Sequence, residues 1–152
     1  MQVRRAVLAD QPALVPLVAA MHEHERLPMG PATEAALARL LADGAFGFVL
    51  VALDPEPVGY AVIGFGYSLE FSGRDAFVDE LFVTPTARDV GIGARLLEAA
   101  EHGCREAGVA ALHLEVDHAN AAARRLYERT GYKAHERHLM TRWLGPGPAS
   151  GP

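Results

Sequence analysis

The sequence predicts a mixed α/β fold, in which a mostly antiparallel central sheet contains one parallel crossover and carries helices on both faces. Two observations predict it. Residues 46–83 contain three strand-like segments separated by the turns "DPEP" and "SGRD", so consecutive antiparallel hairpins are expected. Residues 76–116 then show a strand, a helix and a strand, and such a crossover makes its two strands parallel.

Two helices are expected between the first strand and these hairpins. A short strand in "QVRRAVL" precedes "QPALVPLVAAMHEHE", residues 11–25, whose apolar positions follow a helical period. Asp10 is the expected cap of this helix, and Pro16 is expected to strain it. Thr33 is the expected cap of a second helix, which ends at Gly44.

The C-terminal part completes the order β-α-α-β-β-β-α-β-α-β-β. Residues 92–107 place apolar and small side chains on roughly one side of a helix, and Gly108 ends it. "ALHLEV" predicts a strand, "NAAARRLYERTG" a helix, and "YKAH" with "RHLMTRW" a final pair of strands. We therefore expect one domain over residues 1–144 and a disordered Gly/Pro-rich tail over 145–152.

Composition narrows the class of function. Half of the 152 residues are hydrophobic, but no apolar run suits a membrane span or a signal peptide, so a cytoplasmic protein without a membrane partner is expected. The net charge of −5 argues against a general nucleic-acid binder. The single cysteine, Cys104, excludes an internal disulfide and a cysteine-rich metal site, and no metal is expected.

Two glycines stand where a strand leads into a helix, in "RDVGIG", residues 88–93. Glycine lowers helix stability, so Gly91 and Gly93 serve either a turn or a ligand. The free N–H groups and the dipole of a helix start make an anion site that suits a pyrophosphate. Without Cβ atoms the backbone allows close approach of a phosphate, and Arg88 can add a charged contact.

A bare Gly-x-Gly leaves several interpretations open. A dinucleotide-binding fingerprint needs a further glycine at position 96, which is Leu96. The Gly-Lys-Ser/Thr sequence of a nucleotide-binding phosphate loop is absent. A helix-initiating turn without a ligand is the third interpretation, and a bare Gly-x-Gly by itself favours it.

The arrangement resembles the GNAT family of N-acetyltransferases. That family carries an acetyl-CoA signature, Arg/Gln-x-x-Gly-x-Gly/Ala, at this junction, and "RDVGIG" matches it. "NAAARRLYERTGY", residues 120–132, is similar to the second signature, Asn-x-x-Ala-x-x-Leu-Tyr-x-x-x-Gly-Phe/Tyr. One departure is Asp89-Val90, where the family often has Arg-Gly. Asp89 adds a negative charge near the phosphates.

The resemblance implies acetyl-CoA as cofactor. Free amides of a strand that splays from its neighbour, at residues 81–83, would face the acetyl-pantetheine and stabilise an oxyanion. Asn120 would cap its helix and also bond the pantetheine arm. The implied cofactor-binding residues are Leu81, Phe82, Val83, Arg88, Asp89, Val90, Gly91, Ile92, Gly93, Ala94, Asn120 and Tyr127.

Direct acetyl transfer needs a base for the amine and an acid for the departing thiolate. A substrate ammonium has a pKa of about 10, so a carboxylate or a water chain must take its proton. "DELFV" resembles the acidic pair of diamine and thialysine acetyltransferases, which makes Asp79 and Glu80 equal candidates beside a water-relayed base. Adjacent strand residues point to opposite faces, so at most one of them faces the acetyl group. Tyr127 is the implied acid.

The expected activity is acetyl transfer from acetyl-CoA to a primary amine by direct attack in a ternary complex. A small cationic amine is the expected acceptor, with a peptide N-terminus or protein lysine second. A catalytically silent acyl-CoA-binding module and a nucleotide-binding α/β protein also stay open. For His22, Glu23 and Glu25 a solvated surface is favoured over the acceptor site, whereas Tyr67 and Glu70 are guessed to line it. Resemblance also implies a homodimer through the C-terminal strands.

Overall fold

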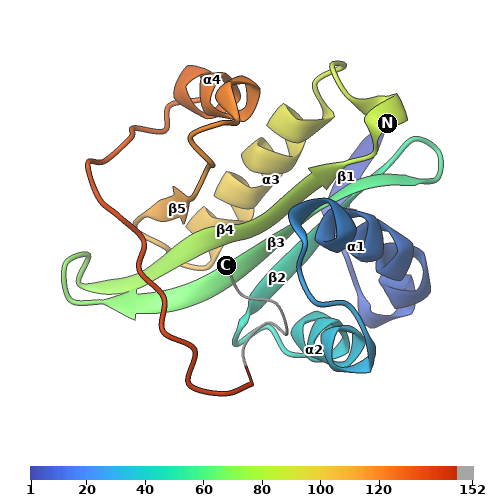
Figure 1. The fold of residues 1–152 in the computed structure, drawn as a ribbon, viewed down its shortest axis with the longest axis horizontal. Helices are drawn as coiled ribbons and strands as arrows, with labels where there is room; N and C mark the ends of the chain where they lie inside the picture. Colours follow the sequence, from blue (N-terminus) through green and yellow to red (C-terminus); the bar gives the residue numbers. More distant parts are fainter. Residues whose placement is uncertain (147–152) are drawn as a thin grey trace.

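The computed structural model describes residues 1–146 and builds them around a five-stranded sheet (Figure 1). The strands are β1 (Gln2–Arg5), β2 (Gly47–Leu53), β3 (Pro57–Ser68), β4 (Gly73–Val83) and β5 (Leu112–Leu114). The helices are α1 (Gln11–Glu25), α2 (Pro31–Ala42), α3 (Ile92–Glu106) and α4 (Ala121–Arg129), with short 3-10 turns η1 (Leu8–Asp10) and η2 (Pro85–Ala87). The spatial order is β1-β2-β3-β4-β5, with only the β4–β5 pair parallel.

Two hydrophobic cores lie on opposite faces of this sheet. Alternate side chains of β2 show the division, because Phe48 and Leu50 pack with α3 while Val49 and Val51 pack with α1 and α2. Figure 1 shows α1 and α2 on one face of the sheet and α3 on the other. The predicted fold class is confirmed. Within residues 1–146, no helix is both long and apolar enough to cross a bilayer.

The predicted final pair of strands is wrong for the described residues. Between the end of α4 and Pro146 the chain forms no strand, and Leu139, Met140 and Trp143 are exposed. A segment with strand propensity becomes a strand only where a neighbouring backbone completes its hydrogen bonds, and no described strand lies beside this one. The tail predicted over 145–152 lies, beyond Pro146, outside the described residues.

The side-chain caps predicted for the first two helices are also wrong. The α2 helix begins earlier than expected because Pro31, whose fixed φ suits the first helical position, follows Gly30 as N-cap. Thr33 therefore lies inside the helix, which ends at Ala42. Asp10 does stand at the N-cap of α1, but its side chain makes no capping bond. The α1 helix continues through Pro16, since its missing N–H removes only one bond in the first turns.

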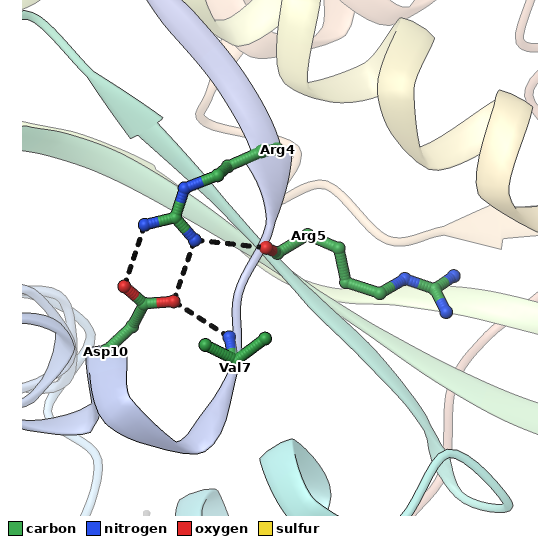
Figure 2. A network of polar contacts seen from close by, with 4 residues as sticks. All are labelled: Arg4, Arg5, Val7 and Asp10. Carbon is green, nitrogen blue, oxygen red and sulfur yellow. Dashed lines mark hydrogen bonds and ion pairs between the residues drawn. The ribbon is translucent and has the colours of Figure 1, made fainter.

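Asp10 instead joins β1 to the start of α1 (Figure 2). Its two carboxylate oxygens each accept a hydrogen bond from the Arg4 guanidinium at 2.8 Å, and one of them also accepts from the Val7 N–H at 2.8 Å. The Arg4 hydrogen bonds, and then the Val7 amide, lower the pKa of Asp10 to about 2. This contact fixes the position of α1 at the edge of the sheet.

Asp10→Asn is expected to lower the free energy of unfolding by about 1–2 kcal/mol at about pH 7. The pKa of Asp10 is lower in the folded chain than its ordinary 3.8, so its stabilisation exists above about pH 4 and is lost as the pH falls toward about 2. Urea unfolding at about pH 7 and at about pH 2 measures this loss of stabilisation. The control is Asp117→Asn, at an exposed aspartate outside the helices and strands, and an Asp10→Asn effect of equal size at the two pH values would contradict the assignment.

Candidate active site

β4 carries a β-bulge at Asp79. Glu80 pairs with Val62 of β3, and the next pair along is Val78 with Ile63, so Asp79 has no partner of its own. Two residues of β4 thus oppose one residue of β3, which bends the strand and shifts its alternation by one residue. The simple alternation behind the predicted opposite orientation of Asp79 and Glu80 does not apply here.

The bulge changes the face on which the following side chains lie. Before it, Ala76 and Val78 pack in the core that contains α3. After it, Leu81 packs against that same core, whereas Phe82 is buried in the core that contains α1 and α2. Glu80, two residues before Phe82, consequently lies on the α1 face.

β5 pairs with β4 only as far as the bulge. The last parallel pair joins Val78 to Leu114, where β5 ends, so no described strand covers that edge of β4 beyond Asp79 (Figure 1). The N–H of Thr84 donates to a carbonyl of β3. Because backbone groups alternate sides along a strand, the N–H groups of Leu81 and Val83 point toward the open edge. These amides belong to the residues predicted to face the acetyl group.

The loop between β4 and α3 contains two left-handed residues, Asp89 with φ 65° and Gly91 with φ 86°. Gly91 is the N-cap of α3 and provides no side-chain cap, and the first helical bond runs from the Arg95 N–H to its carbonyl. The N–H groups of residues 92–94 therefore have no acceptor within the helix. A loop that contains left-handed residues next to the start of a helix can direct several N–H groups to one point and form an anion-binding concavity.

The two glycines of this loop differ in what the fold demands of them. At Gly91 the positive φ favours glycine, and a Cβ there would meet nothing within 4 Å. At Gly93 a Cβ would touch only the Leu126 side chain, at an ordinary 3.6 Å. Packing thus does not require glycine at position 93. The same contact places α4 beside the start of α3.

Arg88 ties this loop back to β4. Its Nε donates to the Val83 carbonyl at 2.9 Å, and its guanidinium carbon lies 5.8 Å from the centre of the Phe82 ring. The side chain reaches a cavity of about 360 Å³ between α1 and the end of β4. That cavity is lined by Ala20, Glu23, His24, Phe82, Pro85 and Arg88.

Glu80 is held by side chains from two other elements. One carboxylate oxygen is hydrogen-bonded to Nε2 of His22 on α1, and the other accepts from the Tyr60 hydroxyl on β3 at 2.8 Å. Nδ1 of His22 lies 2.8 Å from the Pro28 carbonyl. Burial, reinforced by the Glu80 carboxylate, raises the pKa of Tyr60. The expectation of a solvated surface is wrong for His22, which is only 8% exposed.

Asp79 has a different environment. The residue is exposed, and among residues 1–146 its carboxylate has no hydrogen-bond or ion-pair partner. Desolvation by the surrounding protein, and then the negative charge of Glu80, raise the pKa of Asp79. Of the two candidate bases, Asp79 is the one whose carboxylate oxygens make no polar contact with another side chain among the described residues.

The α4 helix carries the second predicted motif. The side-chain oxygen of Asn120 accepts from the Ala123 N–H at 3.1 Å, so the predicted cap is confirmed. Tyr127 packs against the α3-side core, with the Tyr132 ring 6.1 Å away, and burial raises its pKa. Tyr127 faces the same side of the sheet as the glycine loop.

The two residues guessed to line the acceptor site lie away from the glycine loop. Tyr67, 80% exposed, is near the end of β3, and Glu70 lies in the turn between β3 and β4. Tyr60, which the structure does bring to the site, carries no sequence signal because its position resembles any core strand residue. Cys104 is buried as predicted, and burial raises its pKa to about 11.

Comparison with known proteins assigns the family. The family model described as the acetyltransferase (GNAT) family matches residues 16–132, which include both motifs. The chain belongs to this family. An uncharacterised N-acetyltransferase of Bacillus subtilis (strain 168), YhfO, is 31% identical over 134 residues, which are 88% of this chain and 90% of that protein.

Two further proteins are similar to this chain. Thialysine N-epsilon-acetyltransferase of Bos taurus is 31% identical over 80 residues, 50% of this chain and 47% of that protein. The crystal structure of integron cassette protein HFX_CASS3, from the mobile metagenome of Cole Harbour Salt Marsh, superposes with a TM-score of 0.85 at 34% identity, covering 97% of this chain and 93% of that one. The predicted family is confirmed, and the chain is a GNAT N-acetyltransferase.

Proposed function

We propose that this GNAT enzyme transfers the acetyl group of acetyl-CoA to a small cationic primary amine by direct attack in a ternary complex. One observation carries the proposal: the open edge of β4 beyond Asp79 leads directly into the anion-binding loop before α3. Backbone N–H donors therefore continue from the edge of β4 into the loop before α3. A ligand in which a pantetheine arm joins a thioester to a diphosphate requires donors in this arrangement.

The loop before α3 suits the diphosphate of CoA. The N–H groups of Gly91, Ile92, Gly93 and Ala94 are the donors, with the backbone of Asp89 and Val90 completing the turn. A ligand that approaches the backbone explains the glycine at position 93, which packing does not require. The Arg88 guanidinium holds the loop through the Val83 carbonyl and adds positive charge.

When bound, acetyl-CoA supplies an activated thioester, and the chain's own groups do the rest. Asp79 takes a proton from the acceptor ammonium, since both oxygens of Glu80 are engaged. The N–H groups of Leu81 and Val83 donate to the carbonyl oxygen as negative charge develops, while Phe82 anchors the strand. Tyr127 donates a proton to the sulfur as the carbon–sulfur bond breaks, and it is reprotonated by the second proton that the acceptor nitrogen loses when the amide forms. Asn120 keeps its side-chain N–H groups for the pantetheine arm.

A small cationic acceptor is supported by the cavity between α1 and β4. Its volume of about 360 Å³ suits a small molecule, and Glu23 on its wall offers a carboxylate to an ammonium group, while Arg88 on the same wall is held by the Val83 carbonyl. The name of the thialysine acetyltransferase relative also points to a small amine. We further propose a cytoplasmic homodimer, in which exposed Leu139, Met140 and Trp143 supply apolar contact area.

A thiol-release assay with acetyl-CoA over diamines, polyamines, lysine analogues and peptides with free N-termini tests this function. We expect the small diamines and lysine analogues to give the highest kcat/KM. Tyr127→Phe is expected to lower kcat by about 10- to 100-fold with little change in KM for the amine, because only the proton donor is removed.

Three different outcomes would contradict the proposal. A silent acyl-CoA-binding module would bind CoA, release no thiol with any amine and be indifferent to Tyr127→Phe. Preference for peptides would make the enzyme a peptide or protein acetyltransferase. Binding of ATP or NAD in place of CoA would indicate a nucleotide-binding protein.

A further inference from the structure

We propose that His22 is a positioning residue: as a doubly protonated imidazolium it holds Glu80 as a paired carboxylate beside the bulge of β4, and it thereby offsets the negative charge next to Asp79. The assignment of His22 stands on the contacts of α1, β3 and β4. Only its consequence for catalysis rests on the proposed function, because it takes Asp79 to be the base.

Both ring nitrogens of His22 face acceptors. The Pro28 carbonyl, 2.8 Å from Nδ1, can only accept, so Nδ1 must carry a hydrogen. Nε2 faces a carboxylate oxygen of Glu80, whose other oxygen already accepts from the Tyr60 hydroxyl. A carboxyl group ionises at about pH 4 and an imidazole at about pH 6.5, so the shared proton belongs on the ring. Burial opposes the charge, but the Pro28 carbonyl and Glu80 outweigh it and raise the pKa of His22.

This imidazolium connects parts of the site that are distant in sequence. His22 and Glu80 are only 11% and 15% exposed at their side chains, and Tyr60 is fully buried. Pro28 lies in the turn after Arg26, the left-handed residue that ends α1. The network therefore holds the end of α1 and the following turn against β4. Removing one partner would leave a buried charge or acceptor without its complement.

The same network acts on Asp79 through charge. Asp79 follows directly before Glu80, whose negative charge is one of the two causes that raise the pKa of Asp79. The positive ring of His22 offsets part of that charge. Glu80 on β4 and Tyr60 on β3 are the titratable groups that share this network, and Glu23 and His24 follow His22 on α1. Neutralising position 22 leaves Glu80 with its hydrogen bond from Tyr60 but without its positive partner, and this raises the pKa of Asp79 further.

Nuclear magnetic resonance of the full chain tests the ionisation without any assay of activity. In a titration followed by the ¹⁵N signals, the midpoint of His22 should lie above the ordinary histidine value of about 6.5. In His22→Gln, the ¹³C-detected titration midpoint of the Asp79 carboxyl should rise by about half a unit to one unit. His102→Gln, at an exposed histidine of α3, is the matched control and should leave that midpoint in place.

A midpoint of His22 at or below about 6.5 would overturn the proposal, and this measurement on the unaltered chain decides it even if His22→Gln fails to fold. An unchanged Asp79 midpoint in folded His22→Gln would also overturn it. In His22→Gln, the pH below which kcat/KM for the amine falls should rise by the same amount. The dissociation constant of CoA should not change. If the Asp79 midpoint moves and this pH does not, His22 keeps its role and Asp79 is not the base.

Discussion

Gly91→Asp is expected to raise the dissociation constant of CoA by about a hundredfold. The carboxylate would stand where the N–H groups at the start of α3 meet the diphosphate, and juxtaposed like charges cost several kcal/mol at a binding site. The fold itself has room, since a Cβ at Gly91 meets nothing within 4 Å. Calorimetric titration with CoA measures the change, and thermal unfolding shows that the variant is folded.

Gly91→Asn is the matched control for this prediction. Asparagine has nearly the same size as aspartate and tolerates the positive φ of 86° similarly, but it carries no charge. We expect a loss of affinity of less than about tenfold, and the difference between the two variants should shrink as salt screens the charge. Equal affinity of Gly91→Asp and the unaltered enzyme would show that the diphosphate binds elsewhere.

Asp79→Asn is expected to lower kcat/KM for the amine by about 10²- to 10³-fold, the range of a lost general base. Because desolvation and the charge of Glu80 raise the pKa of Asp79, activity in the unaltered enzyme falls as the pH drops through a value above that of an ordinary aspartate. The asparagine variant should lack this acid limb. Steady-state kinetics across pH, with CoA affinity measured in parallel, tests the change.

Glu80→Gln distinguishes the two acidic neighbours. Its carboxylate oxygens are both engaged, by His22 and by Tyr60, so the substitution disturbs packing on the α1 face but leaves the base in place. This variant should be less stable and slower, yet it should retain the acid limb. If Glu80→Gln loses that limb and Asp79→Asn keeps it, Glu80 is the base. If both variants keep it, a water-relayed base is favoured.

Most of the fold follows from local patterns in the sequence. The alternation in β2 and β3 and the turns between strands predict the hairpins, and the amphipathic α3 between two strands predicts the parallel crossover. The C-terminal strands could not be predicted in this way. Their propensity is local, but pairing requires a neighbour, and the described chain supplies none after α4.

The candidate site was likewise predictable only where it depends on residues adjacent in sequence. The glycine loop and the Asn120 cap were predictable because each depends on residues adjacent in sequence. The bulge at Asp79 was not, since one extra residue in β4 leaves no compositional mark. The burial of His22 depends on Tyr60 and Glu80, which come from strands far along the chain. A histidine two residues from another histidine at a helix end gives no sign of such partners.

A crystal structure of the enzyme grown with CoA tests most directly whether main-chain donors from β4 to α3 hold the cofactor. Diphosphate oxygens should lie within about 3.2 Å of the N–H groups at Gly91 to Ala94, with the pantetheine arm along the edge of β4 at Leu81 and Val83. A diphosphate bound at any other surface, or a side chain of the protein occupying that loop, would contradict it.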